Sequence, residues 1–232
     1  MIEHQSKSDS NPRRDANDQV ALDAAIMRGV LTGRSKPAVA PGSSSPFLVM
    51  LSGLPGTGKS YFAGELVKQV PFLVLESDRL RKALVREPRY TRGEHSRVFA
   101  ACHLLLEEFL GQGRRVLFDA ANLTERSRLP VYQIAVRASA PLLVISFTAP
   151  ERTVRRRLAD RAAGQDPGNY SDADWLIHTR LRQGAQPIQR EHIAVDTSGD
   201  IAPVVEEVAR LVRAAGEHSP GPGDDVGITD GL

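Results

Sequence analysis

Five short apolar runs alternate with longer helical patterns between about residues 46 and 215. The apolar runs span 47–52, 72–76, 115–119, 142–147 and 192–196, and helical periodicity occupies 59–69, 94–110, 125–138, 151–163, 172–183 and 203–214. Strands this apolar are typical of a parallel sheet that is covered on both faces. The alternation therefore predicts an α/β fold: a three-layer α/β/α sandwich with a five-stranded parallel sheet, which binds ligands at the carboxyl ends of its strands.

A glycine-rich octapeptide joins the first predicted strand to the first predicted helix. It satisfies the pattern G-x-x-x-x-G-K-[ST] and reads Gly53-Leu54-Pro55-Gly56-Thr57-Gly58-Lys59-Ser60. Its glycines let the backbone curl so that consecutive N–H groups point at phosphate oxygens. Lys59 can reach the β- and γ-phosphates, and the Ser60 hydroxyl can ligate Mg²⁺. The segment predicts a site for ATP and Mg²⁺, with cofactor contacts from Gly53, Pro55, Gly56, Thr57, Gly58, Lys59 and Ser60.

Other sequence features narrow the class of nucleotide-binding protein. The chain has no guanine-specifying N-K-x-D motif, and its D-x-x-G match at 196–199 lies on the last predicted strand, too late to be a GTPase switch. Motor, transporter and helicase ATPases are larger and carry further motifs that this chain lacks. Size and motif placement favour a nucleotide-kinase-like enzyme.

Polar residues follow the second predicted strand, where an acceptor would meet the γ-phosphate. Asp78 could accept the proton of an acceptor hydroxyl or orient that hydroxyl. Arg81 lies three residues later on the same helical face and could hold an anionic part of the substrate. Tyr90, Arg92 and His95 are further candidates for contacts with the acceptor. The alternative for Asp78 is that it only caps a helix that begins at residue 79.

The third predicted strand ends in Asp119, and Asn122 follows three residues later. An acid at this position can bind Mg²⁺ through water or position the serine of the octapeptide. Asn122 would then face the cleft as an uncharged group that contacts the substrate. The alternative is a helix cap, for which Thr124 is the better candidate.

A run of arginines follows the fourth predicted strand. Arg157 and Arg161 are spaced i, i+4 and share one helix face. With the Gly-containing segment after them they resemble a helical lid, at about 151–171, that supplies arginines to charge developing on the phosphates. A solvated helix face is the alternative for either arginine.

The two ends of the chain differ in composition from its centre. Residues 1–45 are predicted to form a flexible arm, interrupted by one short helix at about 15–31 that places Val20, Ala24, Met27 and Leu31 on one face. Residues 216–232 are predicted to be disordered, which leaves one domain at 46–215.

Cys102 is the sole cysteine, so an intrachain disulfide and a Cys-based zinc site are excluded. Without a signal-like start or a membrane-length apolar run, a cytoplasmic location is expected.

The set of motifs resembles that of the P-loop kinase group containing the 5′-polynucleotide kinase domain and small predicted kinases, with zeta-toxin-like and chloramphenicol phosphotransferase-like enzymes more distant. The resemblance covers roughly 46–215. It implies that Asp78 is the general base, that Arg81 contacts a substrate phosphate and that Arg157 and Arg161 belong to the lid. It also implies that Thr197 lies in an adenine-side loop. The segment 119–122 resembles the D-x-T-N element of the group, except that Ala121 stands where Thr is usual.

Three functions follow as hypotheses. The leading one is ATP- and Mg²⁺-dependent transfer of the γ-phosphate to a hydroxyl of a small molecule or nucleotide-like acceptor. The second is 5′-hydroxyl polynucleotide kinase activity, which the arginines favour and the net charge of only +2 does not. The third is a non-catalytic ATP-binding module that acts on a protein partner.

Overall fold

The computed structural model describes residues 12–32, 45–164 and 173–217. Its centre is one parallel sheet in the order β2-β3-β1-β4-β5. The five strands are β1 (Phe47–Gly53), β2 (Leu73–Glu76), β3 (Arg115–Asp119), β4 (Leu142–Thr148) and β5 (Ile193–Asp196). Parts of the predicted arm, lid tip and tail, at 1–11, 33–44, 165–172 and 218–232, lie outside the described residues.

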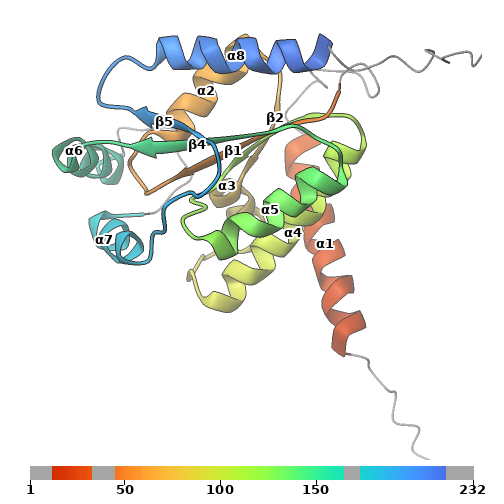
Figure 1. Ribbon diagram of the computed structural model, residues 1–232. Helices are drawn as coiled ribbons and strands as arrows, with labels where there is room; N and C mark the ends of the chain where they lie inside the picture. The colour runs from red at the N-terminus through yellow and green to blue at the C-terminus, as the bar shows by residue number, and fades with distance from the viewer. Residues whose placement is uncertain (1–11, 33–44, 165–172, 218–232) are drawn as a thin grey trace, which may run out of the picture.

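Helices cover both faces of the sheet, and two more lie at its carboxyl edge (Figure 1). The helices are α1 (Pro12–Thr32), α2 (Lys59–Gln69), α3 (Ser77–Leu84), α4 (Arg92–Gly111), α5 (Glu125–Arg137), α6 (Glu151–Ala162), α7 (Trp175–Gln183) and α8 (Ala202–Glu217). In Figure 1, α2 and α8 lie above the sheet, α1, α3, α4 and α5 lie below it, and α6 and α7 lie beyond the strand ends. The predicted three-layer α/β/α architecture is confirmed.

The central strand β1 explains why the sheet needs two covered faces. Every residue of β1 is buried. Leu48 and Met50 belong to the core on the face of the sheet that α1, α3, α4 and α5 cover. Val49 and Leu51 belong to the core on the opposite face, which α2 and α8 cover. Alternate side chains of a strand point to opposite faces, so a continuous apolar run is what two covered faces require.

Helix α3 was not among the helical segments that periodicity predicted. It begins at Ser77, directly after β2, with Glu76 in the capping position. Asp78 therefore lies inside the first turn, and the alternative in which it caps a helix from residue 79 is wrong. Thr124, by contrast, caps α5 and forms a reciprocal capping box with Ser127, as its position predicted.

Helix α1 is a docked element of the fold. Its predicted apolar face is present, because Ala24, Met27 and Leu31 are buried in the core that α4 shares. The fully buried carboxylate of Asp23 accepts a hydrogen bond from Arg97 of α4, with Nη2 2.6 Å from Oδ1. The interpretation of residues 1–45 as a flexible arm is therefore corrected for this helix.

Replacing Met27 by Ala is expected to lower the free energy of unfolding by about 2–4 kcal/mol, because it deletes a fully buried side chain between α1 and the domain. The matched control is Ile26→Ala, one position away and 43% exposed, which should change stability by less than about 0.5 kcal/mol. Urea unfolding of both variants checks this. Equal, small effects would show that α1 does not stabilise the domain.

Candidate active site

The glycine-rich loop runs between β1 and α2 at the carboxyl edge of the sheet. Gly56 and Gly58 have φ angles of 80° and 90°, a conformation that L side chains rarely adopt. A Cβ atom on Gly56 would lie 2.9 Å from Cγ1 of Val154, and one on Gly53 would lie 2.9 Å from the carbonyl oxygen of Phe147. The loop is thus packed against β4 and α6 at positions that only glycine fits, and the seven predicted cofactor contacts lie together in it.

Lys59 occupies the floor of the site. Its Nζ donates to the carbonyl oxygen of Leu54, 3.1 Å away. Burial lowers the pKa of Lys59, with Arg161 adding to the effect and the carboxylates of Asp119 and Asp78 opposing it. Because this ammonium has lost part of its hydration, its electrostatic attraction to an anionic ligand such as a phosphate is stronger than it would be in bulk water.

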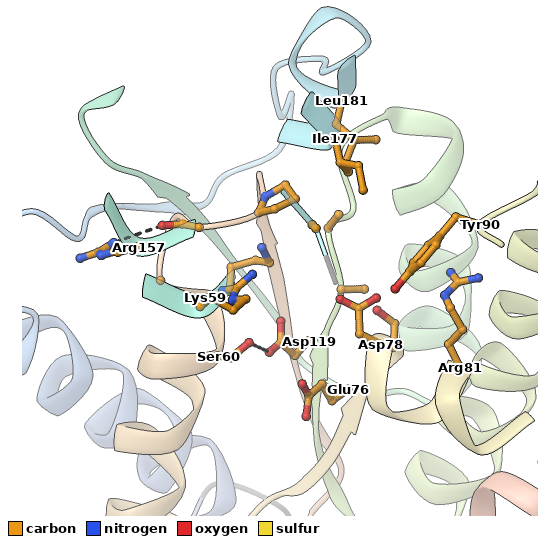
Figure 2. Close-up of a pocket in the computed structure, with 18 of the residues that line it drawn as sticks. Lys59, Ser60, Glu76, Asp78, Arg81, Tyr90, Asp119, Arg157, Ile177 and Leu181 are labelled. Carbon is orange, nitrogen blue, oxygen red and sulfur yellow. Dashed lines mark hydrogen bonds between the residues drawn. The ribbon is translucent and has the colours of Figure 1, made fainter. Parts of the chain in front are cut away.

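Ser60 and Asp119 form the candidate magnesium position. The Ser60 hydroxyl donates to Oδ2 of Asp119 at 2.7 Å (Figure 2). Burial raises the pKa of Asp119, while Lys59 and the hydrogen bond from Ser60 oppose that shift. No group of three or more His, Cys, Asp or Glu side chains that could hold a metal occurs among the described residues. One hydroxyl and one carboxylate fit Mg²⁺, which usually takes its remaining ligands from water and nucleotide phosphates.

The octapeptide, α3 and α7 enclose a cleft of about 1030 Å³. Lys59, Ser60, Asp78, Asp119 and Arg161 all line it. In Figure 2, Asp78 lies across from Lys59, beside the Ser60–Asp119 pair. The structure therefore brings together residues that the sequence places on three different strand ends and on α6.

Arg81 lines the same cleft but is already paired. Its Nη1 lies 2.6 Å from Oε1 of Glu94, and the two side chains are only 4% and 10% exposed. The guanidinium also lies 4.8 Å from the centre of the Tyr90 ring. The predicted contact between Arg81 and an anionic substrate would have to compete with this buried ion pair.

Asn122 does not face the cleft. It is 2% exposed, and its amide donates to the carbonyl oxygen of Leu51 at 2.7 Å. Its backbone carbonyl oxygen accepts from the Ser52 hydroxyl and from the buried Arg128, and its φ angle is 47°. Asn122 thus ties the loop after β3 to β1, and the predicted substrate contact is corrected to a structural role.

Arg157 lines the cleft next to the loop that follows β5. Its Nη1 donates to Oγ1 of Thr197 and its Nη2 to the Thr197 carbonyl oxygen, both at 2.7 Å. The Thr197 hydroxyl donates in turn to the carbonyl oxygen of Thr57 at 2.8 Å. In Figure 2, Arg157 lies on the side of Lys59 that faces away from Asp78. Arg157 therefore braces the loop after β5 against the octapeptide while it also lines the cleft, and its catalytic role stays a prediction. Arg161 lies close enough to contribute to the lowered pKa of Lys59.

Glu76 is a cleft residue that the sequence interpretation missed. It ends β2, pairs in register with Asp119 of β3 and lines the cleft. Burial, together with the carboxylates of Asp119 and Asp78, raises the pKa of Glu76 to about 7. The sequence shows that Glu76 ends a strand, but it does not show that Asp119 of β3 lies beside it.

In the absence of nucleotide and Mg²⁺, Glu76 is expected to make stability pH-dependent. The folded pKa of about 7 exceeds the unfolded value of about 4.3, so the folded state binds more protons between these limits. The contribution of Glu76 to the free energy of unfolding is fully present below about pH 4. It decreases as the pH rises to 7, by at most about 1.4 kcal/mol per pH unit. Urea unfolding from pH 5 to 8 should show a shallower decline for Glu76→Gln. Identical declines in both proteins would contradict the assignment.

A second residue that was missed connects α7 to the octapeptide. His178 is 5% exposed, and its Nδ1 lies 2.9 Å from the carbonyl oxygen of Pro55. Trp175 stacks on His178 with ring centres 4.9 Å apart, and the Arg155 guanidinium of α6 lies 3.9 Å from the Trp175 ring centre. The stack joins α6 and α7 to the octapeptide.

Replacing His178 by Ala is expected to weaken ATP binding by roughly 2- to 13-fold, the range that the net loss of one hydrogen bond predicts. His192→Ala removes an exposed histidine that bonds to the Arg190 carbonyl oxygen and is the matched control. Fluorescence of Trp175, the sole tryptophan, can follow the titration. An ATP affinity equal in both variants would show that the contact does not hold the loop.

Residues 48–188 match a family model described as an AAA domain. This region carries the octapeptide, Asp78, Asp119 and both lid arginines, and it makes up more than half of the chain. The chain belongs to this AAA domain family. Helix α1 lies before the region that matches the family.

Solved structures share the fold of this AAA domain protein at low sequence identity. Mycobacterium tuberculosis APS kinase CysC in complex with AMPPNP and APS is 18% identical, covers 73% of this chain and 99% of its own, and has a TM-score of 0.55. Chaetomium thermophilum Kti12 in complex with ADP-AlF3 is 18% identical, covers 72% of this chain and 98% of its own, and has a TM-score of 0.56. A gluconokinase from Sinorhizobium meliloti 1021 is 18% identical, covers 74% of this chain and 96% of its own, and has a TM-score of 0.50. These likenesses confirm the P-loop kinase-like fold.

The search of curated proteins gave no significant match. Among the helices that the structure describes, none combines the length and apolar character needed to cross a bilayer.

Proposed function

We propose that this protein is a kinase that transfers the γ-phosphate of ATP, with Mg²⁺, to a hydroxyl group of a small molecule. The observation that carries the proposal is the placement of Asp78 across one cleft from Lys59 and the Ser60–Asp119 pair. A carboxylate that faces the loop is placed to accept the proton of an acceptor hydroxyl, as the catalytic aspartate of kinases does. An ATP-binding module would need the loop but not the acid opposite it.

The reaction divides between the two sides of the cleft. Asp78 accepts the proton of the acceptor hydroxyl as the oxygen of that hydroxyl attacks the γ-phosphorus. The bond between the γ-phosphorus and the oxygen that bridges it to the β-phosphate breaks, which leaves ADP. Lys59 and Arg161 stabilise the negative charge that develops on the transferred group. Ser60 and Asp119 would hold Mg²⁺, which would neutralise negative charge on the phosphates.

Transfer of label from γ-labelled ATP tests the proposal against its alternatives. The protein and its Asp78→Asn variant are incubated with Mg²⁺ and either a small-metabolite extract or 5′-hydroxyl oligonucleotides. Label in a small metabolite that depends on Asp78 is expected. Label only in the oligonucleotide would make the protein a polynucleotide kinase, and ATP binding without labelling of either pool would favour the non-catalytic module.

A further inference from the structure

The charge of Arg81 is satisfied inside the fold. Besides the 2.6 Å ion pair with Arg81, Glu94 uses its other oxygen to accept from the backbone N–H groups of Arg89, at 2.8 Å, and Tyr90, at 3.2 Å. The Nε atom of Arg81 has no hydrogen-bond partner among the described residues, but it is itself buried. Arg81 and Glu94 therefore form a neutral unit that joins α3 to α4.

An anionic group placed on Arg81 would meet an unfavourable field. Separating the pair leaves the carboxylate of Glu94 buried without its partner, which is strongly destabilising. The same side of the cleft also carries Asp78, with Glu76 and Asp119 beyond it. Arg89 and Arg180 line the cleft as well, but both residues are exposed to solvent. Arg81 is thus already paired, and solvent would screen an ion pair between the acceptor and Arg89 or Arg180.

Apolar and aromatic groups form the walls around Asp78. His95 stacks on Phe99 with ring centres 4.2 Å apart and an interplanar angle of 29°. Partial desolvation, with the nearby Arg81, lowers the pKa of His95 and so disfavours a charge on this stacked pair. In Figure 2, Ile177 and Leu181 of α7 lie over the space beside Asp78, and Tyr90 borders it. Such walls suit a ligand with apolar or aromatic surface.

We propose that the phosphate acceptor is an uncharged alcohol with a ring or other apolar surface, and that it carries no phosphate or carboxylate near the reacting hydroxyl. The inference rests on the proposed kinase function and names the substrate class of that site. Arg81 is then a positioning residue: its pair with Glu94 fixes α3, which carries Asp78, and the chain segment that carries Tyr90. This reassigns the anion-binding role predicted for Arg81.

Fractionation of the acceptor pool tests the substrate class directly. A small-metabolite extract is separated on an anion-exchange resin, and the unbound material is divided on a reversed-phase column before each fraction is incubated with γ-labelled ATP, Mg²⁺ and the full chain. We expect label in the unbound fraction that the reversed-phase column retains. Label chiefly in the anionic fraction, or in the polar fraction that neither column retains, would overturn the substrate class and leave the kinase function standing. No label in any fraction would overturn the kinase function itself, and the inference with it.

A pair of variants tests the role of the ion pair. Glu94→Gln should leave the charge of Arg81 unbalanced and raise the ratio of label in the anionic fraction to label in the retained fraction several-fold. Glu108→Gln is the matched control, because Glu108 also lies on α4 and pairs with an arginine, Arg28, but does not line the cleft. Equal ratios in the two variants would show that the pair does not set the charge preference. Circular dichroism confirms that both variants are folded.

Discussion

Phosphoryl transfer is expected to fall by about 10²- to 10⁴-fold when Asp78 is replaced by Asn, the range that general base catalysis supplies. The substitution keeps the size and hydrogen-bonding shape of the side chain but removes its ability to take a proton. Since the octapeptide and the Ser60–Asp119 pair stay intact, the affinity for ATP should change little. Initial rates with saturating acceptor, together with a binding titration, separate the two quantities.

Asp160→Asn is the control for this experiment. Asp160 also lines the cleft, but it belongs to α6 and is exposed. Its replacement should leave the rate within a factor of a few. If the two variants lost activity equally, or if Asp78→Asn kept the full rate, Asp78 would not be the base.

Replacing Lys59 by Met is expected to lower the turnover number by about 10²- to 10³-fold, because a preorganised charge at the transferred group is removed. ATP binding should weaken as well, because the proposed contact of Lys59 with phosphate would be lost in the ground state as well as in the transition state. The ammonium is half-buried and partly desolvated, so its removal should not unfold the protein. Lys68→Met, on the same helix and 69% exposed at its side chain, is the matched control and should behave as the unchanged protein. Equal turnover in the two variants would contradict the role of Lys59.

Local patterns were sufficient to predict the sheet and the phosphate loop. The apolar runs predicted all five strands, because a strand covered on both faces has to be apolar throughout. The octapeptide predicted its own neighbours, since a loop that curls around phosphate needs a strand before it and a helix after it. Helix α1 was also visible as a pattern, but its docking depends on α4, which lies some 80 residues away.

The residues that sequence reasoning misassigned have partners distant in the chain. Arg81 resembled an anion contact until the fold placed Glu94 of α4 against it. Asn122 resembled a cleft residue, but its side-chain amide nitrogen donates to the backbone of β1. Motif spacing gives the edge of the sheet on which a residue lies, whereas its role depends on groups that only tertiary packing brings near.

The most direct test of the central claim is a ³¹P NMR measurement of the reaction with Mg²⁺, ATP and a small-metabolite extract. The account predicts that a new phosphomonoester resonance appears in step with ADP and that neither product forms with Asp78→Asn. Conversion of ATP to ADP and inorganic phosphate without a phosphomonoester, or no change in ATP while it still binds, would contradict phosphoryl transfer to a hydroxyl acceptor.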